Sequence, residues 1–262
     1  MRLQFASDLH LNSWASKEIP FENILSPVAD ALVLCGDIGH PDSLLLRVFL
    51  KWCSKRWKTI FWIPGHHEMT DVWHLKTKTY DQTLKHIQLV ASEFPNVEVL
   101  HRDAFVTEDG FLFLACPLWA PLTAMSEELS KDPVYRSITH QYKQDIQWLR
   151  DQIRTSERPV IVATHYPPTY TLFSKDLVNQ SQSVPFALES EMLLRPPVHA
   201  WICGYLHTSV IIQRPWSDVD GTSGHTLIVS NARGYPDDTK TLYRKDAVLR
   251  LENTSKSINP FK

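Results

Sequence analysis

Short apolar runs alternate with amphipathic segments along most of the 262-residue chain. The short runs are rich in β-branched and aromatic residues, a composition that predicts β-strands. These predicted strands are residues 2–7, 30–36, 59–63, 97–100, 105–108, 111–116, 159–164, 199–203, 209–214, 225–230 and 246–252. The longer segments carry apolar residues at three- and four-residue spacing, which predicts helices at 42–57, 79–94, 139–155 and 185–194.

The order of these elements predicts the fold class. Strands and helices alternate in the first half, whereas fewer helices separate the later strands. The Asp-Gly pair in TEDGF, residues 107–111, predicts a hairpin between two of those later strands. We therefore expect one α/β domain built on two packed sheets.

The segment TIFWIPGHHEMTD, residues 59–71, joins a predicted strand to a cluster of polar side chains. The apolar run 59–63 ends at a Pro-Gly pair, and His66, His67 and Glu68 follow it. Open α/β sheets carry their chemistry at this end of their strands. A polar loop without a chemical role would have the same sequence pattern. The residues that follow the other predicted strands are therefore needed to distinguish a functional site from such a loop.

The same residue types follow four other predicted strands. They are Asp8 and His10 in SDLH, Asp37 in CGD, His165 in THYPP, and Tyr205 and His207 in CGYLH. The carboxyl ends of parallel strands meet at one rim. A lone histidine after a strand usually satisfies a local hydrogen bond, but five such strand ends favour a metal centre. Mixed imidazole and carboxylate donors suit Mn, Fe or Zn.

In this order the segments resemble the signature blocks of the calcineurin-like metallophosphoesterases, which are D-x-H, G-D, G-N-H-[DE], a later single His, and G-H-x-H. The resemblance covers roughly residues 1–235 and includes SNARGYP, residues 230–236, which is similar to the Asn-Pro-Arg-Gly-Tyr block of small bacterial-type members. It implies a four-layer α/β/β/α sandwich of two mixed β-sheets flanked by helices. It also implies a single domain over residues 1–262, with a tail at 253–262.

The resemblance implies a binuclear centre of two divalent metal ions, with Asp37 bridging them. The ligands of the first metal would be Asp8, His10, Asp37 and His207. Those of the second would be Asp37, His66, His165 and Tyr205. His67 would be catalytic beside the leaving group, as a proton donor or a stabiliser of charge. Two such ions about 3.5–4 Å apart clamp a phosphoryl group and activate water for in-line attack.

Two departures from the family pattern fall on the second metal. His66 stands where the family has Asn, and Tyr205 stands where it has His. Imidazole is a competent ligand, whereas a free phenol titrates only near pH 10. We expect a binuclear centre with a weakened second site, and a centre reduced to one metal remains the alternative. Glu68 is expected to orient a neighbouring ligand.

Two other residues are candidate substrate contacts. The guanidinium of Arg233 could bind a phosphate through two hydrogen bonds or pair with a structural carboxylate. Trp119 could form a wall of the substrate pocket or belong to the core. Tyr235 follows the same predicted strand as Arg233 and is expected on the same rim.

Several other polar residues have weaker claims. His40 and Asp42 could reach the site, or they could form a polar loop with a helix N-cap at Asp42–Ser43. The remaining histidines have no partner pattern and are interpreted as incidental: His74, His86, His101, His140, His199 and His225.

Composition limits the classes of function. The formal net charge of −2 and the lack of a basic, aromatic-interleaved segment argue against a nucleic-acid partner. No serine-hydrolase elbow, Walker loop or dinucleotide fingerprint is present. The four cysteines form no C-x-x-C pair, no apolar stretch is long enough for a membrane, and no signal-peptide pattern opens the chain. The expected compartment is cytoplasmic.

The predicted function is metal-dependent hydrolysis of a phosphomonoester or phosphodiester. The partner would be a phosphorylated small molecule or a phosphoprotein substrate. The alternative is a catalytically weak or inactive relative that serves as a binding module. Specificity is expected to lie in loops at 69–80, 117–138 and 166–184, and the oligomeric state is left open.

Overall fold

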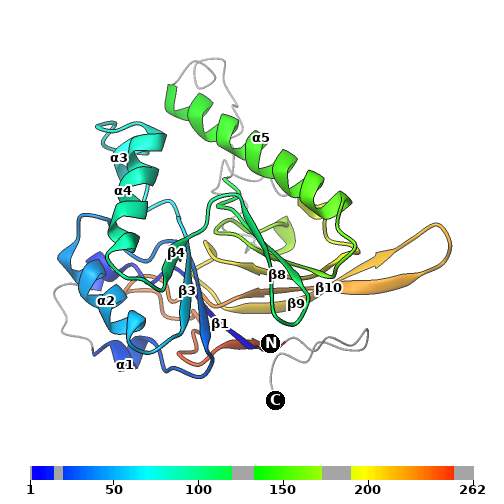
Figure 1. Ribbon diagram of the computed structural model, residues 1–262, viewed down its shortest axis with the longest axis horizontal. Coiled ribbons are helices and arrows are strands. Elements are labelled where there is room, and N and C mark those ends of the chain that lie inside the picture. Colours follow the sequence, from blue (N-terminus) through cyan, green and yellow to red (C-terminus); the bar gives the residue numbers. More distant parts are fainter. Residues whose placement is uncertain (1, 15–19, 120–132, 173–189, 251–262) are drawn as a thin grey trace.

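The computed structural model describes residues 2–14, 20–119, 133–172 and 190–250, which form two β-sheets with flanking helices (Figure 1). The five-stranded sheet has the order β11-β1-β2-β3-β4. Its strands are β1 Arg2–Ala6, β2 Ala31–Cys35, β3 Thr59–Ile63, β4 Val97–Val99 and β11 Val248–Arg250. β1 to β4 are parallel, and β11 pairs antiparallel with β1, so the sheet is mixed.

The six-stranded sheet has the order β5-β6-β7-β8-β10-β9. Its strands are β5 Asp103–Val106, β6 Leu112–Ala115, β7 Val160–Ala163, β8 Val198–Cys203, β9 Val210–Ser217 and β10 Ser223–Ser230. β6, β7, β8 and β10 are parallel, whereas the outer strands β5 and β9 are antiparallel to their neighbours. Both sheets are mixed, as expected.

Helices cover the outer faces of the two sheets. They are α1 Phe21–Ile24, α2 Leu44–Ser54, α3 Thr70–Trp73, α4 Tyr80–Ser92 and α5 Pro133–Arg154, with 3-10 turns η1 Leu11–Trp14 and η3 Tyr170–Leu172. In Figure 1, α2 and α4 lie on the side of β1 and β3, and α5 lies on the side of β8 and β10. Of these helices, none combines the length and hydropathy that a bilayer-spanning segment needs.

The apolar runs are continuous because both faces of each central strand are buried. In β2, Val33 belongs to a cluster between the sheets that also holds Phe113 of β6 and Ile161 of β7. Its neighbours Leu32 and Leu34 point the other way and belong to the cluster that includes the helices. This alternation of a two-residue period builds the four layers.

Most element predictions are confirmed, with shifts at the ends. The Asp-Gly hairpin joins β5 to β6, and Gly110 has φ +83° there. α5 begins earlier than predicted, at Pro133, because proline is favoured at a first helical position. The short helices α1 and α3 were not predicted. Of the predicted helix at 185–194 only residues 190–194 are described, and residues 190 and 191 are helical.

Candidate metal centre

The loops after five parallel strands meet at one end of the two sheets. Backbone hydrogen bonds join these loops. The backbone N–H of Asp8 donates to the carbonyl of Gly36 at 2.9 Å, and the backbone N–H of His10 donates to the carbonyl of Asp37 at 2.9 Å. Gly204, after β8, donates to the carbonyl of His165, after β7, at 2.9 Å. The predicted convergence of these strand ends is therefore present, and it involves both sheets.

Several residues at this rim have the left-handed backbone conformation, which residues other than glycine usually avoid. Positive φ angles occur at several site residues: Asp8 (52°), His10 (44°), Asp37 (56°), Tyr205 (71°) and His207 (49°). A left-handed conformation of a non-glycine residue costs on the order of 1–2 kcal/mol. Such strain persists where the surrounding structure enforces it, and it is concentrated at functional sites.

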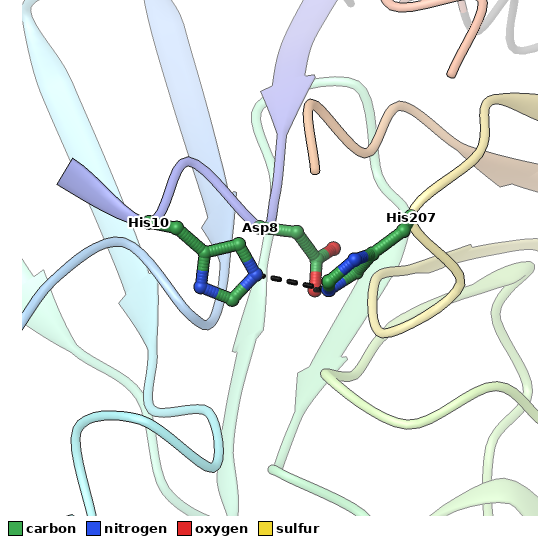
Figure 2. A group of neighbouring side chains, drawn as sticks. All are labelled: Asp8, His10 and His207. Carbon is green, nitrogen blue, oxygen red and sulfur yellow. Dashed lines mark hydrogen bonds and ion pairs between the residues drawn. The ribbon is translucent and has the colours of Figure 1, made fainter. Parts of the chain in front are cut away.

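Asp8, His10 and His207, the first donor group, point toward one another in Figure 2. One ligand atom from each lies within 4.8 Å of the others. Nε2 of His10 is 2.9 Å from Nε2 of His207, and that atom is 3.8 Å from Oδ1 of Asp8. The three residues come from loops after β1 and β8, so the two sheets build this group jointly.

Asp8, Asp37 and His165 form the second donor group under the same distance limit. A third donor group consists of His10, Asp37 and His67. Asp8, His10 and Asp37 each belong to two of the groups, so the donor residues form one continuous cluster. Asp37 shares one group with His10, a predicted ligand of the first metal, and another with His165, a predicted ligand of the second, which fits the bridging position that the family resemblance implies.

His165 shows why a cation fits this cluster. Its Nδ1 is 2.9 Å from the carbonyl of Cys35, which can only accept, so Nδ1 carries the proton. Burial lowers the pKa of His165 to about 4, and the ring is therefore neutral at pH 7. Its Nε2 lone pair is buried without a hydrogen-bond partner among the described residues, yet it is 3.5 Å from Oδ1 of Asp37. Two acceptors that face each other are stabilised by a cation between them.

The pKa shifts of two other residues in the cluster also fit a bound cation. Burial, with the Asp37 carboxylate beside it, raises the pKa of Asp8 well above its usual range. Burial and the neighbouring imidazoles lower the pKa of His10 to about 2. A bound cation would offset the repulsion between the carboxylates and would accept lone pairs from the neutral rings.

Glu68 orients the Asp37 loop, as expected. Its buried carboxylate accepts from the N–H groups of Asp37 at 2.9 Å, Ile38 at 2.7 Å and Gly65 at 2.8 Å. These bonds join the loop after β2 to the loop after β3. Gly65 is needed here because a Cβ at this position would lie 2.4 Å from the amide nitrogen of Asp37.

Tyr205 acts on Asp8 through its backbone. Its N–H lies 3.1 and 2.9 Å from the two oxygens of the Asp8 carboxylate. Its ring lies at a 30° tilt against Tyr166, 4.4 Å between centroids, and meets His165 edge-on at 5.7 Å between centroids. Coordination of a metal by its phenol stays a prediction.

His66 faces another histidine. Its Nε2 lies 3.2 Å from Nε2 of His74, which had been interpreted as incidental. Burial lowers the pKa of His66 to about 4, while the nearby Asp37 acts in the opposite direction. His66 belongs to none of the donor groups above. Its role as a ligand of the second metal stays a prediction, and a structural role remains the alternative.

The two predicted substrate contacts lie in different surroundings. The Arg233 guanidinium stacks over the ring of Trp14 at 3.8 Å, and burial lowers its pKa. Trp119 is fully buried at 0% exposure, and its Nε1 donates to the Tyr80 hydroxyl at 2.8 Å. These surroundings support the core role for Trp119. Contact of either side chain with a substrate stays a prediction.

Two further residues support the site: Asp238, which was not predicted, and Tyr235, which was expected on the rim without a role. Asp238 Oδ2 lies 2.9 Å from Nδ1 of His207, and the Tyr235 hydroxyl lies 2.8 Å from Nε2 of His67. Both follow β10 in the segment NARGYPDD. The available signal was that β10 is one more apolar run with polar residues at its carboxyl end.

A fourth acidic cluster, His40, Asp42 and Asp71, contains a cation of the chain itself. The ammonium of Lys78 lies 2.7 Å from Oδ2 of Asp71 and 3.6 Å from Oδ2 of Asp42. Asp42 also pairs with Nε2 of His86 at 2.6 Å. The N-cap of α2 is Ser43, whose side chain makes no capping bond. His40 and Asp42 thus belong to a surface ion-pair network.

Comparison with known proteins gives the family. The Calcineurin-like phosphoesterase family profile matches residues 1–209. Uncharacterized protein L509 of Acanthamoeba polyphaga mimivirus is 24% identical over 246 residues, covering 78% of this chain and 84% of that protein. The crystal structure of the phosphopantetheinyl hydrolase PptH from Mycobacterium tuberculosis superposes with a TM-score of 0.62 at 17% identity, covering 90% of each chain.

At this identity, the likeness to PptH supports the fold alone. The family profile spans most of the chain and includes every member of the three donor groups. This chain is a member of the calcineurin-like phosphoesterase family.

Proposed function

We propose that this protein is a metal-dependent phosphoesterase that hydrolyses a phosphomonoester or a phosphodiester. The observation that carries the proposal is the buried Nε2 lone pair of His165 facing Oδ1 of Asp37 at 3.5 Å, within a cluster of further carboxylate and imidazole donors. We propose that two ions are held there, with Asp37 shared between them. Bound divalent ions would polarise the phosphoryl oxygens and lower the pKa of a water molecule.

Side chains of the donor groups would hold the two ions, and His67 would act on the substrate. Asp8, His10 and His207 would hold one ion, and Asp37 with His165 would hold the other. His67 would serve the leaving group, since its backbone N–H is held at 2.7 Å by Oδ1 of Asp37 and 41% of its side chain is exposed. A ring that is anchored and still reachable by solvent suits a proton donor to an entering ester.

The substrate is proposed only as a class. A phosphorylated small molecule or a phosphoprotein would present the same phosphoryl group to this rim, and the cytoplasm is the compartment we propose. PptH is named as a phosphopantetheinyl hydrolase, so a phosphopantetheinyl compound belongs in the first substrate panel.

The experiment compares the wild-type chain with Asp37→Asn. Both are purified without chelator, loaded with Mn²⁺, and assayed on p-nitrophenyl phosphate and on bis-p-nitrophenyl phosphate while metal content is measured. We expect activity in the wild type that is lost in the variant. Equal background rates in a fully metal-loaded wild type and in the variant would contradict the proposal and favour the binding-module alternative.

A further inference from the structure

Asp145 of α5 is a buried carboxylate that bonds to the loop after β6. Its side chain is 0% exposed, and its Oδ2 accepts from the backbone N–H of Trp119 at 3.3 Å. The preceding residue, Leu118, also directs its backbone N–H at this carboxylate and has φ 51°. A left-handed leucine persists where neighbouring groups enforce it, and the carboxylate of Asp145 is one such group.

Arg102 is the charge partner of this carboxylate. Its Nη1 lies 2.6 Å from Oδ1 of Asp145 and 3.2 Å from Oε1 of Gln141, one turn earlier in α5. Burial raises the pKa of Asp145 to about 6, while Arg102 and the backbone N–H groups of the loop act in the opposite direction. A buried carboxylate is costly unless it is paired and hydrogen-bonded, and Asp145 is both.

The segment held by Asp145 bonds in turn to the loop that carries His165. The carbonyl of Pro117 accepts from the backbone N–H groups of His165 and Tyr166, both at 3.1 Å. On the other side, the carbonyl of His165 accepts from the backbone N–H of Gly204 at 2.9 Å. The loops after β6 and β8 thus fix the backbone of His165, whereas the carbonyl of Cys35 fixes its ring.

Asp145 has the same relation to its sheet as Glu68 has to the other. Glu68 accepts from backbone N–H groups of the loops after β2 and β3, which carry Asp37 and His67. Both carboxylates are fully buried, and neither belongs to a donor group. Groups that fix the surroundings of a metal ligand determine where its donor atom lies, so each carboxylate supports donors that it does not itself contact.

We propose that Asp145, paired with Arg102, is a positioning residue for the second ion. It holds the segment 117–119, and through the Pro117 carbonyl it fixes where Nε2 of His165 meets that ion. This inference rests on the proposed function, in which His165 and Asp37 hold the second ion. The first donor group belongs to the loops after β1 and β8, so its ion should bind independently of Asp145.

The test measures calorimetric titrations of metal-free protein with Mn²⁺ and compares three variants with the wild type. Asp145→Asn replaces one acceptor oxygen with an amide N–H₂ group. The double variant Arg102→Met/Asp145→Leu removes both charges together, so that no unpaired charge is left buried and the chain can still fold. Arg102→Lys is the matched control, because it keeps the carboxylate and a cation beside it. His165→Ala identifies the second ion as the one whose binding is lost.

In both variants that lack the carboxylate, we expect the second ion to bind about 10-fold more weakly, at the lower end of the 10–100-fold cost of losing a direct partner of a metal ligand. The first ion should bind within about twofold of the wild type in all three variants, and Arg102→Lys should keep both affinities. A purely structural role would lower the free energy of unfolding without changing the ratio of the two affinities. Unchanged binding of the second ion in the folded double variant, or equal weakening of both ions, would overturn the role of Asp145.

Failure of the proposed function would give a different result. A wild type that binds both ions but hydrolyses neither p-nitrophenyl phosphate nor bis-p-nitrophenyl phosphate would refute the proposed function, while the affinities would still decide the role of Asp145. A wild type that binds no ion dependent on His165 would refute this inference as well.

Discussion

The first donor group (Asp8, His10 and His207) and the second donor group (Asp8, Asp37 and His165) differ in how they are supported. In the first, His207 has a carboxylate partner, Asp238, at its far nitrogen. In the second, His165 is held by the backbone carbonyl of Cys35. The two family ligands that would complete the second side are replaced by His66 and Tyr205, and His66 belongs to none of the donor groups.

The comparison indicates that one shared residue, Asp37, can connect two candidate metal positions that keep unequal numbers of the family's ligands. Asp37 belongs to the second and the third donor groups, and it is fixed by the network around buried Glu68. A weaker second ion would therefore depend on a carboxylate that the other loops also hold in place. Single substitutions can test the contributions of the two donor groups separately.

The largest effect is expected at Asp37, the carboxylate that we propose is shared by the two ions. Asp37→Asn removes the charge that both ions would share, so we expect a loss of at least about 10³-fold in kcat. Metal content measured by mass spectrometry should fall for both ions. A variant that keeps full metal content and activity would show that the two sides do not share this carboxylate.

A smaller effect is expected on the first donor group alone. Asp238→Asn weakens the carboxylate that orients His207, and loss of such a partner typically costs about 10–100-fold in metal affinity. Titration of metal-free protein with Mn²⁺ should show weaker binding of one ion and unchanged binding of the other. Equal weakening of both would remove the distinction between the sides.

In the metal-free protein, the charged carboxylate of Asp8 should destabilise the folded state. Burial and Asp37 raise the pKa of Asp8, so the folded chain binds this proton more tightly than the unfolded chain. Its contribution to stability therefore falls as pH rises above about 4 and is fully unfavourable once pH exceeds the raised value. At pH 7, Asp8→Asn should raise the free energy of unfolding of the metal-free protein, because the variant carries no charge to bury there.

That gain should shrink toward zero as pH falls to about 4, in denaturant titrations of both proteins. Added Mn²⁺ should stabilise the wild type more than the variant, because the variant lacks a ligand. A variant that is less stable than the wild type without metal would contradict this account of the first side.

The smallest effect is expected at Tyr205. Tyr205→His restores the family ligand at a position whose φ of 71° histidine tolerates, and the second ion should bind about 3–10-fold more tightly. Tyr205→Phe is the matched variant, because it removes only the hydroxyl. If the phenol is a ligand, calorimetric titration should show weaker binding of the second ion in Tyr205→Phe, and unchanged binding would assign the residue to its backbone role.

The sequence predicted the part of the site that depends on strand ends. Asp8, Asp37, His165 and His207 each follow an apolar run, and parallel strands bring such positions together whatever the loops do. The departures at His66 and Tyr205 were visible as well. Their consequences were not, because the direction of a side chain in a loop depends on neighbours such as His74 and Tyr166 that no local pattern indicates.

Other features were beyond the reach of local patterns for the same reason. Trp119 is buried because Tyr80 of α4 accepts its N–H and because Asp145 of α5 accepts its backbone N–H at 3.3 Å. Asp238 reaches His207 through a loop whose turn depends on Gly234. Contacts between distant segments decide these positions, whereas hydrophobic periodicity reports only on each segment alone.

The most direct measurement is the anomalous scattering of a Mn²⁺-loaded crystal. The account predicts two peaks roughly 3.5–4 Å apart on either side of the Asp37 carboxylate, one within bonding distance of His207 and the other of His165. A fully loaded crystal with no peak among these residues would contradict it, and a single peak bound by only one side would show that the centre is not binuclear.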